Sequence, residues 1–219
     1  MKKTFLNVFM IAGIAMATVG CKNDTTSEDA KEVATANAEA MEYAVDTSTS
    51  VIEWEGNKPT GTHTGTIQLK NGTFKANDSI IESGTFVISM TSINVTDLEG
   101  DEKNNLESHL KGTVEGKEGD FFNVNQFPEA TFVVTGVNQV NGQTMLQGNL
   151  TMKEDTKNIE FPVTINQTED AIELTSEPFT IDRTQWKVNY GSKSVFDGLG
   201  DKFINDDIIL TLNLKAKKA

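Results

Sequence analysis

The chain has two histidines, and neither lies in a pattern that would hold a metal ion or perform acid–base catalysis. His63 lies in the run Thr-Gly-Thr-His-Thr-Gly, and His109 comes at the end of a predicted short helix. Neither has a second ligand two or four positions further along, as metal sites on strands and helices usually do. The sequence also lacks the G-x-S-x-G, P-loop and H-E-x-x-H motifs. We therefore expect both histidines to be structural and the protein not to be an enzyme.

Two acidic stretches have ligand types that calcium prefers, but their spacing does not fit a calcium site. Asp97, Glu99, Asp101 and Glu102 lack the spacing and the glycine of an EF-hand loop. They suit the start of a helix, where carboxylates are stabilised by the free N–H groups. The run Asp-Gly-Leu-Gly-Asp at residues 197–201 is typical of a turn. The sequence therefore predicts no metal site.

The most distinctive polar cluster is Asp182-Arg183, which is followed by Thr-Gln-Trp186. It comes at the end of an apolar strand pattern, so a cation and an aromatic ring lie close together. One interpretation is structural, with Arg183 paired to a carboxylate and stacked on Trp186. The other is functional, with Arg183 at the mouth of a cavity, where it contacts the headgroup of a ligand. The residues alone leave both interpretations open.

The only cysteine, Cys21, follows a predicted export signal. A basic start precedes an apolar run at residues 5–19, which is short for a membrane span of about 20 residues. The sequence Thr18-Val-Gly-Cys21 resembles a bacterial lipobox, in which the cysteine is acylated, although the usual leucine is replaced by Thr18. Lys22 stands where an aspartate would favour the inner membrane. We predict a lipoprotein signal peptide at residues 1–20 and an exported protein, anchored to the outer membrane through acylated Cys21. The alternative is an ordinary signal peptide with an incidental cysteine.

The charge and composition limit the partners of the protein and divide the rest of the chain. With 19 Lys and Arg against 32 Asp and Glu, the formal net charge is −13. So acidic a surface repels phosphate backbones, and nucleic-acid binding is not expected. Residues 21–41 contain almost no large apolar side chain, which predicts a flexible tether after the anchor. The length allows one folded domain, at residues 42–219.

From Tyr43 onward, apolar residues alternate with mostly polar ones, which predicts β-strands. The clearest strand is the last, in which Ile208, Leu210, Leu212 and Leu214 share one face. Similar alternation occurs around residues 67–70, 86–95, 130–134, 146–152, 159–166 and 172–181.

Short polar dipeptides between these runs predict tight turns. Asn71-Gly72 and Asn141-Gly142 are the type favoured in two-residue hairpins, and Asn77-Asp78 and Glu169-Asp170 mark further turns. Strands of about eight to twelve residues, each with one apolar face, predict a closed antiparallel barrel, with a two-sheet sandwich as the alternative. A short helix is predicted at 101–111, where Leu106 and Leu110 lie four apart. Residues 194–205 are predicted to form a loop or a broken helix.

Several motifs occur in order across residues 42–216. The most specific is Phe-Phe-x-Val-x-x-Phe-Pro-x-Ala-x-Phe at 121–132. The others include Ile-Glu-Trp54, Gly-Asn-Leu-Thr151 and Ile-Asp-Arg-Thr-Gln-Trp186. Together they resemble the YceI-like family of periplasmic polyisoprenoid-binding proteins. The lipobox and the run Lys-Pro-Thr-Gly-Thr-His-Thr-Gly at 58–65 resemble the lipoprotein branch of this family in the Bacteroidota.

Two features depart from the family pattern. Glu154 stands where Leu-Thr-x-Lys-Gly-x-Thr usually has its glycine, which predicts an altered hairpin. Residues 112–119 form a Gly-, Glu- and Lys-rich insertion, which predicts a surface loop.

The resemblance implies an all-β, closed, antiparallel, eight-stranded, lipocalin-like barrel with one or two short helices. Its elongated apolar tunnel would hold a long isoprenoid, such as a quinone tail or a polyprenyl lipid, without a cofactor. The residues expected to line the tunnel or its mouth are Trp54, Ile67, Phe86, Ile88, Phe132, Val134, Leu146, Leu150, Phe161, Ile181, Arg183, Trp186, Leu210 and Leu212.

Alternation alone does not distinguish a hollow barrel from a filled one. The alternative function is therefore a structural or partner-binding surface lipoprotein whose barrel is solid. A homodimer is left open in both cases. An enzyme acting on lipids has no nucleophile, acid pair or metal set in the sequence to support it.

Overall fold

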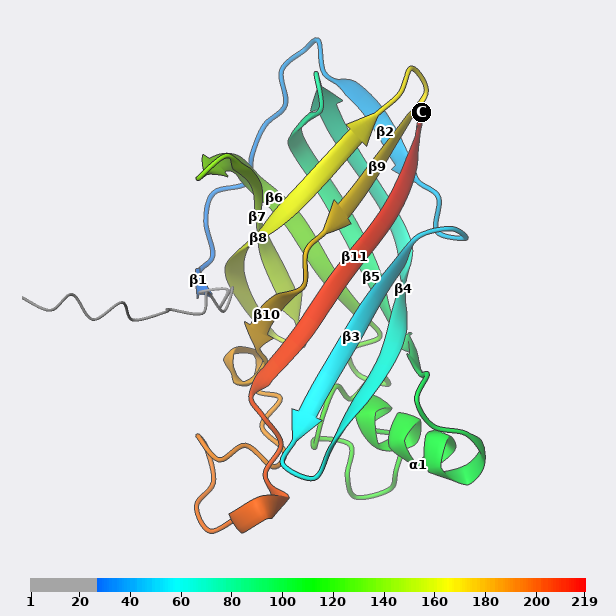
Figure 1. The fold of residues 1–219 in the computed structure, drawn as a ribbon, viewed down its shortest axis with the longest axis vertical. Helices are drawn as coiled ribbons and strands as arrows, with labels where there is room; N and C mark the ends of the chain where they lie inside the picture. Colours follow the sequence, from blue (N-terminus) through cyan, green and yellow to red (C-terminus); the bar gives the residue numbers. More distant parts are fainter. Residues whose placement is uncertain (1–26) are drawn as a thin grey trace, which may run out of the picture.

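The computed structural model describes residues 27–219, and the predicted signal peptide and Cys21 lie outside the described residues. The described chain contains eleven strands, one α-helix and two short 3-10 helices (Figure 1). In chain order these are β1 (Glu28–Asp29), β2 (Met41–Val45), β3 (Val51–Lys58), β4 (Gly61–Asn77), β5 (Ile80–Val95), α1 (Gly100–Lys111), β6 (Glu129–Val140), β7 (Gln143–Met152), β8 (Asp155–Gln167), β9 (Ala171–Ser176), β10 (Phe179–Asp182), η1 (Arg183–Trp186), η2 (Gly200–Lys202) and β11 (Asp207–Lys218). No helix within residues 27–219 is long and apolar enough to cross a membrane.

Eight of the strands close into an antiparallel ring, which confirms the predicted all-β fold. Neighbours pair in the order β3-β4-β5-β6-β7-β8-β9-β11, and β11 returns to pair with β3. β2 continues the line of β3 between β4 and β11, and β10 continues that of β9 along β11. We call the end of the ring that carries α1, η1 and η2 the helix end, and the opposite end, where β11 finishes, the C-terminal end (Figure 1).

The hairpin turns follow the sequence signals, with one exception. Asn141 and Gly142 form the β6–β7 turn with φ of 52° and 81°, as the mirror-image hairpin turn requires. Asn71-Gly72 does not form a turn, so this prediction is wrong. The pair lies inside β4, where a bulge between Leu69 and Asn71 interrupts the pairing with β5. A Cβ on residue 72 would lie 2.8 Å from Val45 Cγ2, so the glycine here permits close packing.

Of three further local predictions, the helix is confirmed, the strand at 172–181 is refined, and the altered hairpin at Glu154 is not found. α1 confirms the helix at 101–111; it ends at Lys111 and is followed by Gly112, whose φ of 67° is left-handed. The strand predicted at 172–181 is divided into β9 and β10, because Pro178 between them has no N–H for the ladder. The β7–β8 ladder is intact up to Met152 and Asp155, so the missing glycine at Glu154 leaves this hairpin in place.

The segment predicted as a flexible tether is bound to the outside of the ring from its first described residues, so this prediction is wrong for residues 27–40. β1 pairs with the start of β8. Asn149 accepts a hydrogen bond from the Lys31 N–H at 2.9 Å and donates one to the Lys31 carbonyl at 2.7 Å. Asn158, which is 2% exposed, donates to Asn149. These hydrogen bonds join the backbone of the segment to the Asn149 side-chain amide, so the attachment does not require a large apolar side chain. We call residues 27–40 the strap.

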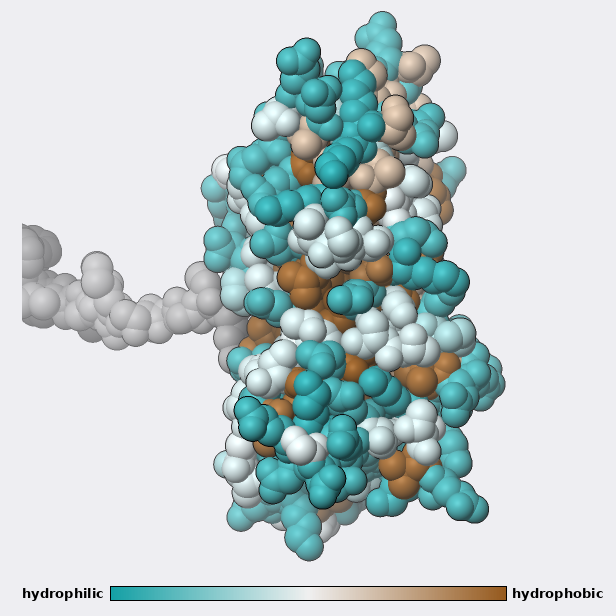
Figure 2. All heavy atoms as spheres, turned by 90° about the vertical axis from the view of Figure 1, so that its right-hand side faces the viewer, coloured by the Kyte–Doolittle hydropathy of each residue, from teal (hydrophilic) through white to brown (hydrophobic). Residues whose placement is uncertain are grey.

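The interior of the ring is filled at the C-terminal end and hollow at the helix end. At the C-terminal end, the rings of Tyr43 and Phe74 stack with centres 5.5 Å apart, and Ala76 on β4 and Ile81 on β5 are buried. The alternative of a solid barrel therefore applies only to this end. Figure 2 shows that hydrophilic side chains dominate the outer face that carries β4 and α1, with hydrophobic atoms surfacing in patches between them.

Candidate functional site

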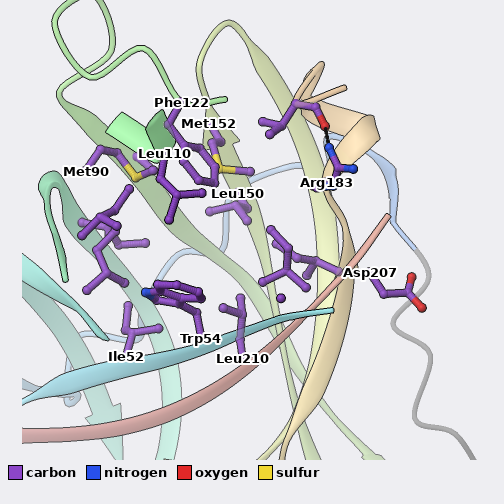
Figure 3. A pocket seen from close by; sticks show the side chains of 18 of the residues that line it. Ile52, Trp54, Met90, Leu110, Phe122, Leu150, Met152, Arg183, Asp207 and Leu210 are labelled. Atoms are coloured by element: carbon purple, nitrogen blue, oxygen red, sulfur yellow. Dashed lines mark hydrogen bonds between the residues drawn. The ribbon is translucent and has the colours of Figure 1, made fainter. Parts of the chain in front are cut away.

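An apolar cavity of about 410 Å³ occupies the helix end of the ring. Its size lies within the range of ligand pockets, roughly 300–1,000 Å³. The strands supply its wall, and Leu110 of α1 and Phe122 of the following loop cover part of the open end. In Figure 3 the side chains of Trp54 and Leu210 point across the cavity toward Leu110 and Phe122.

The structure brings together nearly all the residues that the sequence predicted to line a tunnel. Those at the cavity wall are Trp54, Ile67, Phe86, Ile88, Phe132, Leu146, Leu150, Phe161, Ile181, Arg183, Leu210 and Leu212. Val134 and Trp186 do not line it, and placing them there was wrong. Val134 is packed in the core two residues beyond Phe132 on the same face of β6. The Trp186 indole is fully buried and donates to the Leu150 carbonyl at 3.0 Å, which holds the ring behind the wall.

A band of phenylalanine rings crosses the ring of strands where the cavity meets the filled core. The centres of Phe86 and Phe132 lie 6.2 Å apart, those of Phe132 and Phe161 5.6 Å, and those of Phe161 and Phe179 4.3 Å. All four line the cavity, and Phe74, which stacks on Phe86, does not. These rings therefore form the floor of the cavity.

Two glycines make room for the largest rings in the wall. A Cβ on residue 65 would lie 2.3 Å from Trp54 Cζ2, and one on residue 148 would lie 2.1 Å from Phe132 Cζ. Gly65 and Gly148 thus let the neighbouring strands pass directly under these rings, and Trp54 Nε1 can donate to the Thr66 carbonyl at 3.3 Å. A side chain at residue 148 would displace the Phe132 ring, and one at residue 65 would clash with both the Trp54 ring and, at 2.1 Å, the Asn94 carbonyl oxygen.

Sequence reasoning missed the residues that form the mouth of the cavity. Leu106 and Leu110 of α1, Phe122, Tyr190 and Ile204 all contribute to it. The i, i+4 spacing of the two leucines predicted the helix, but nothing in the sequence placed that helix over the end of the ring. Further wall residues missed from the predicted set, including Met90, Ile93, Met152 and Leu174, lie on the predicted apolar faces.

Both histidines lie at the mouth, and each is paired with a carboxylate. His63 Nδ1 lies 2.9 Å from Asp97 Oδ2, and His109 Nε2 lies 2.7 Å from Asp120 Oδ2. Burial raises the pKa of Asp97, but hydrogen bonds from the Thr64 N–H and from His63 outweigh it and leave this pKa below its usual range. Within residues 27–219 no group of three or more His, Cys, Asp or Glu could hold a metal ion. The mouth therefore carries a few fixed polar groups around an apolar interior.

Arg183 lines the cavity, but its donors face the protein. The side chain is 2% exposed. Its Nε donates to the Asn205 carbonyl at 3.0 Å, Nη2 to the Ile204 carbonyl at 3.2 Å, and Nη1 to the Val188 carbonyl. Figure 3 marks a hydrogen bond of Arg183 with a dashed line. Asp206 Oδ1 lies 3.7 Å from Nη2. Burial lowers the pKa of the guanidinium, and Asp206 partly offsets this effect. The contacts support the structural interpretation of Arg183, with backbone carbonyls in place of a Trp186 stack.

The helix that covers the mouth is attached to the ring through Glu107. This carboxylate accepts a hydrogen bond from the Val95 N–H, at the end of β5, at 3.0 Å. Lys111 and Lys103 lie 3.3 and 3.7 Å from its oxygens. Burial raises the pKa of Glu107, but the Val95 N–H and the two lysines together hold it below its ordinary value of 4.5.

Replacing Glu107 by Gln should remove a pH-dependent part of the stability. Because the folded-state pKa is lowered, the ionised Glu107 stabilises the native state above pH 4.5, and this contribution is lost as the pH falls from 4.5 through the folded pKa. Urea unfolding of both proteins between pH 7 and pH 3 tests this, since other carboxylates are common to both. The stability advantage of the wild type should shrink below about pH 4.5. If the free energies of unfolding of the wild type and of Glu107→Gln changed in parallel with pH, the prediction would be contradicted.

The comparisons with known proteins agree with this architecture. The family model of the YceI-like domain matches residues 43–216. BcnA from Burkholderia cenocepacia shares 20% identity, with 78% of this chain and 98% of that chain covered and a TM-score of 0.56. A polyisoprenoid binding domain from Saccharophagus degradans, implicated in plant cell wall breakdown, shares 11% identity, with 82% and 99% covered and a TM-score of 0.56. No curated protein matches the chain.

At these identities the two solved structures establish a shared fold. The family rests on the domain model, which spans the whole ring from Tyr43 in β2 to Ala216 in β11. The chain, with its closed ring and its cavity at the helix end, belongs to the YceI-like family.

Proposed function

We propose that the protein binds one long isoprenoid or similar amphiphilic lipid in this cavity, without catalysis. The observation that carries the proposal is the cavity itself, a largely apolar space of about 410 Å³ closed by phenylalanine rings at one end and open at the other. The structurally similar domain from Saccharophagus degradans is a polyisoprenoid binding domain, which supports the same ligand class.

The depth of the cavity sets the length of tail it can shelter. Along β11 its wall runs from Asp207 to Leu214. Seven steps of about 3.3 Å, on a strand tilted by about 40°, correspond to a depth of roughly 18 Å. An extended chain gains about 1.2 Å per bond, so four isoprene units of four main-chain bonds fill roughly this depth. Longer tails would have to bend or protrude.

The binding energy need come only from apolar contact. Four isoprene units contain about twenty carbon groups, whose burial at about 0.8 kcal/mol each gives roughly 16 kcal/mol before costs. Ordering of the tail and loss of its free motion remove a large part of this. Tight binding therefore needs no catalytic group and no charged contact along the tail.

We also propose that acylated Cys21 anchors the protein to the outer membrane, and that the bound lipid is stored or carried there. The support is the lipobox-like sequence before Cys21 and the strap, which begins six residues after it. Acyl chains contribute about 0.8 kcal/mol per buried CH₂, and two or more give stable attachment. Mass spectrometry of the intact protein would reveal the acyl groups.

A two-part experiment tests the ligand. Organic extraction of the purified full chain, followed by mass spectrometry, should recover a prenyl lipid. The delipidated protein is then titrated with prenols of two, three, four and six isoprene units, with the emission of Trp54 at the cavity wall as the readout. Affinity should rise at least tenfold per added unit up to about four units and then level off. Absence of any copurified or rebound lipid would overturn the proposal.

A further inference from the structure

The loop that connects η1 to β11 forms the rim of the cavity and carries exposed apolar side chains on its outer side. We call residues 187–205 the rim loop. Tyr190, Ile204 and Asn205 line the cavity. Val195 and Phe196 are 46% and 49% exposed, and Tyr190 is 42% exposed. Of the seven large hydrophobic side chains that are exposed within residues 27–219, these three lie within one stretch of seven residues. A single loop therefore joins the apolar interior to an apolar surface.

The exposed side chains are held in place by an ordered backbone. The Phe196 N–H donates to the Ser192 carbonyl at 2.9 Å, and the Ile204 N–H donates to the Gly191 carbonyl at 2.8 Å. The Asn205 N–H donates to the Asn57 carbonyl of β3 at 2.8 Å. The buried Arg183 binds carbonyls near both ends of the loop. The fold thus presents Val195 and Phe196 to solvent on a fixed support.

The charge of the rim loop differs from that of the whole protein. It contains three lysines (Lys187, Lys193 and Lys202) and two aspartates (Asp197 and Asp201), which gives 3 − 2 = +1. Asp206, which completes the connection to β11, brings the count to zero, but this carboxylate faces the buried Arg183 at 3.7 Å. The whole chain carries −13. Exposed aromatic and aliphatic side chains beside lysines are typical of surfaces that lie in the headgroup region of a bilayer, whereas the acidic remainder would be repelled by anionic lipids.

The strap brings the start of the described chain to the same end of the ring. β1 pairs with Asn158 and Lys157, which lie within four residues of the start of β8. Glu28 is seven positions after Cys21, so at most about 25 Å of chain can separate them. In Figure 1 β1 lies at about mid-height beside β8, the rim loop projects below the ring, and the C-terminus lies at the top.

We infer that the rim loop docks on a lipid bilayer with Val195 and Phe196 in the headgroup region, so that the cavity mouth faces the membrane and the ligand enters from the bilayer. This inference rests on the proposed function for the identity of the ligand. The membrane contact itself is independent of it, because the exposed pair and the lysines lie outside the cavity.

The direct test places a fluorophore on the rim loop. In the full chain carrying Cys21→Ser, which has no other cysteine, Phe196→Cys and Ile80→Cys are labelled separately with an environment-sensitive dye. Ile80 is 54% exposed at the opposite end of the ring and serves as the control. Phosphatidylethanolamine–phosphatidylglycerol vesicles should raise and blue-shift the emission at 196 only. The inference would be overturned if the emission of the dye at position 196 did not respond to vesicles. It would also be overturned if that emission changed with protein concentration in the absence of vesicles, since this would indicate contact with a second copy of the chain.

A second test measures transfer. The double variant Val195→Ser with Phe196→Ser should take up an isoprenoid from vesicles roughly tenfold more slowly than the wild type. Its affinity for the same isoprenoid added in detergent should be unchanged, since neither side chain lines the cavity. Ile80→Ser with Val140→Ser, which removes exposed apolar side chains at the C-terminal end, should leave transfer unchanged. Equal transfer rates for both double variants would overturn the inference, while failure of the wild type to bind in detergent would overturn only the proposed function.

Discussion

The Ala130→Phe protein should fold normally and lose its lipid. Ala130 is 3% exposed, lies at the cavity wall near the start of β6, and is paired in register with Ile88 of β5. A phenyl ring there occupies space that the tail would fill between the mouth and the phenylalanine floor. Displacing about four carbon groups of the ligand costs roughly 3 kcal/mol, which weakens binding by a factor of about one hundred or more. Isoprenoid titration measures the affinity, and urea unfolding measures the stability.

The same substitution at Ala76 supplies a matched control. Ala76 is 1% exposed on β4 at the C-terminal end, where it is paired with Ile81 and does not line the cavity. Because the core is filled there, Ala76→Phe should lower the free energy of unfolding by about 1–3 kcal/mol or more and leave the affinity of the folded protein unchanged. A similar loss of stability in both variants would mean that the helix end is packed as well. Unchanged affinity in Ala130→Phe would place the ligand elsewhere.

This contrast also shows what alternation in a sequence can predict. Leu69 and Phe74 both belong to inward-facing positions of β4, yet Leu69 lines the cavity and Phe74 is part of the filled core. Period-two alternation identifies which face of a strand is buried. Whether side chains from opposite walls then meet depends on the width of the ring and on the sizes of residues far apart in the chain. For this reason the barrel and most of its wall could be predicted, and the boundary between hollow and filled parts could not.

Local signals failed where distant residues decide the structure. Asn149 and Asn158 look like solvated outward positions of β7 and β8, but the strap covers them, and they are 8% and 2% exposed. The bonds that hold the strap join residues 118 positions apart. The composition of residues 27–40 shows only that they have few apolar side chains. It does not show whether their backbone groups can pair with residues elsewhere in the chain. The Asn71-Gly72 signal failed for a related reason, since Val45 and Phe86 pack against Gly72.

Arg183→Met should be among the most destabilising single substitutions in the helix end. Methionine has a similar length but donates no hydrogen bond, so the carbonyls of Val188, Ile204 and Asn205 lose their partner. Asp206, whose side chain is 15% exposed, would be left as a largely buried charge without its cation. Removing one member of such a pair costs about 3–5 kcal/mol. Urea unfolding at neutral pH measures this loss.

Two further variants identify the cause of the effect. Asp206→Asn in the Arg183→Met background should restore about 1–2 kcal/mol, because it removes the unpaired carboxylate. Lys187→Met removes a neighbouring cation whose side chain is 65% exposed and paired with Asp155, and should cost less than about 1 kcal/mol. If Arg183 acted instead by contacting a lipid headgroup, Arg183→Met would weaken binding and leave stability near that of the wild type. The two interpretations that the Asp-Arg-Thr-Gln-Trp motif left open therefore predict opposite results in the same pair of measurements.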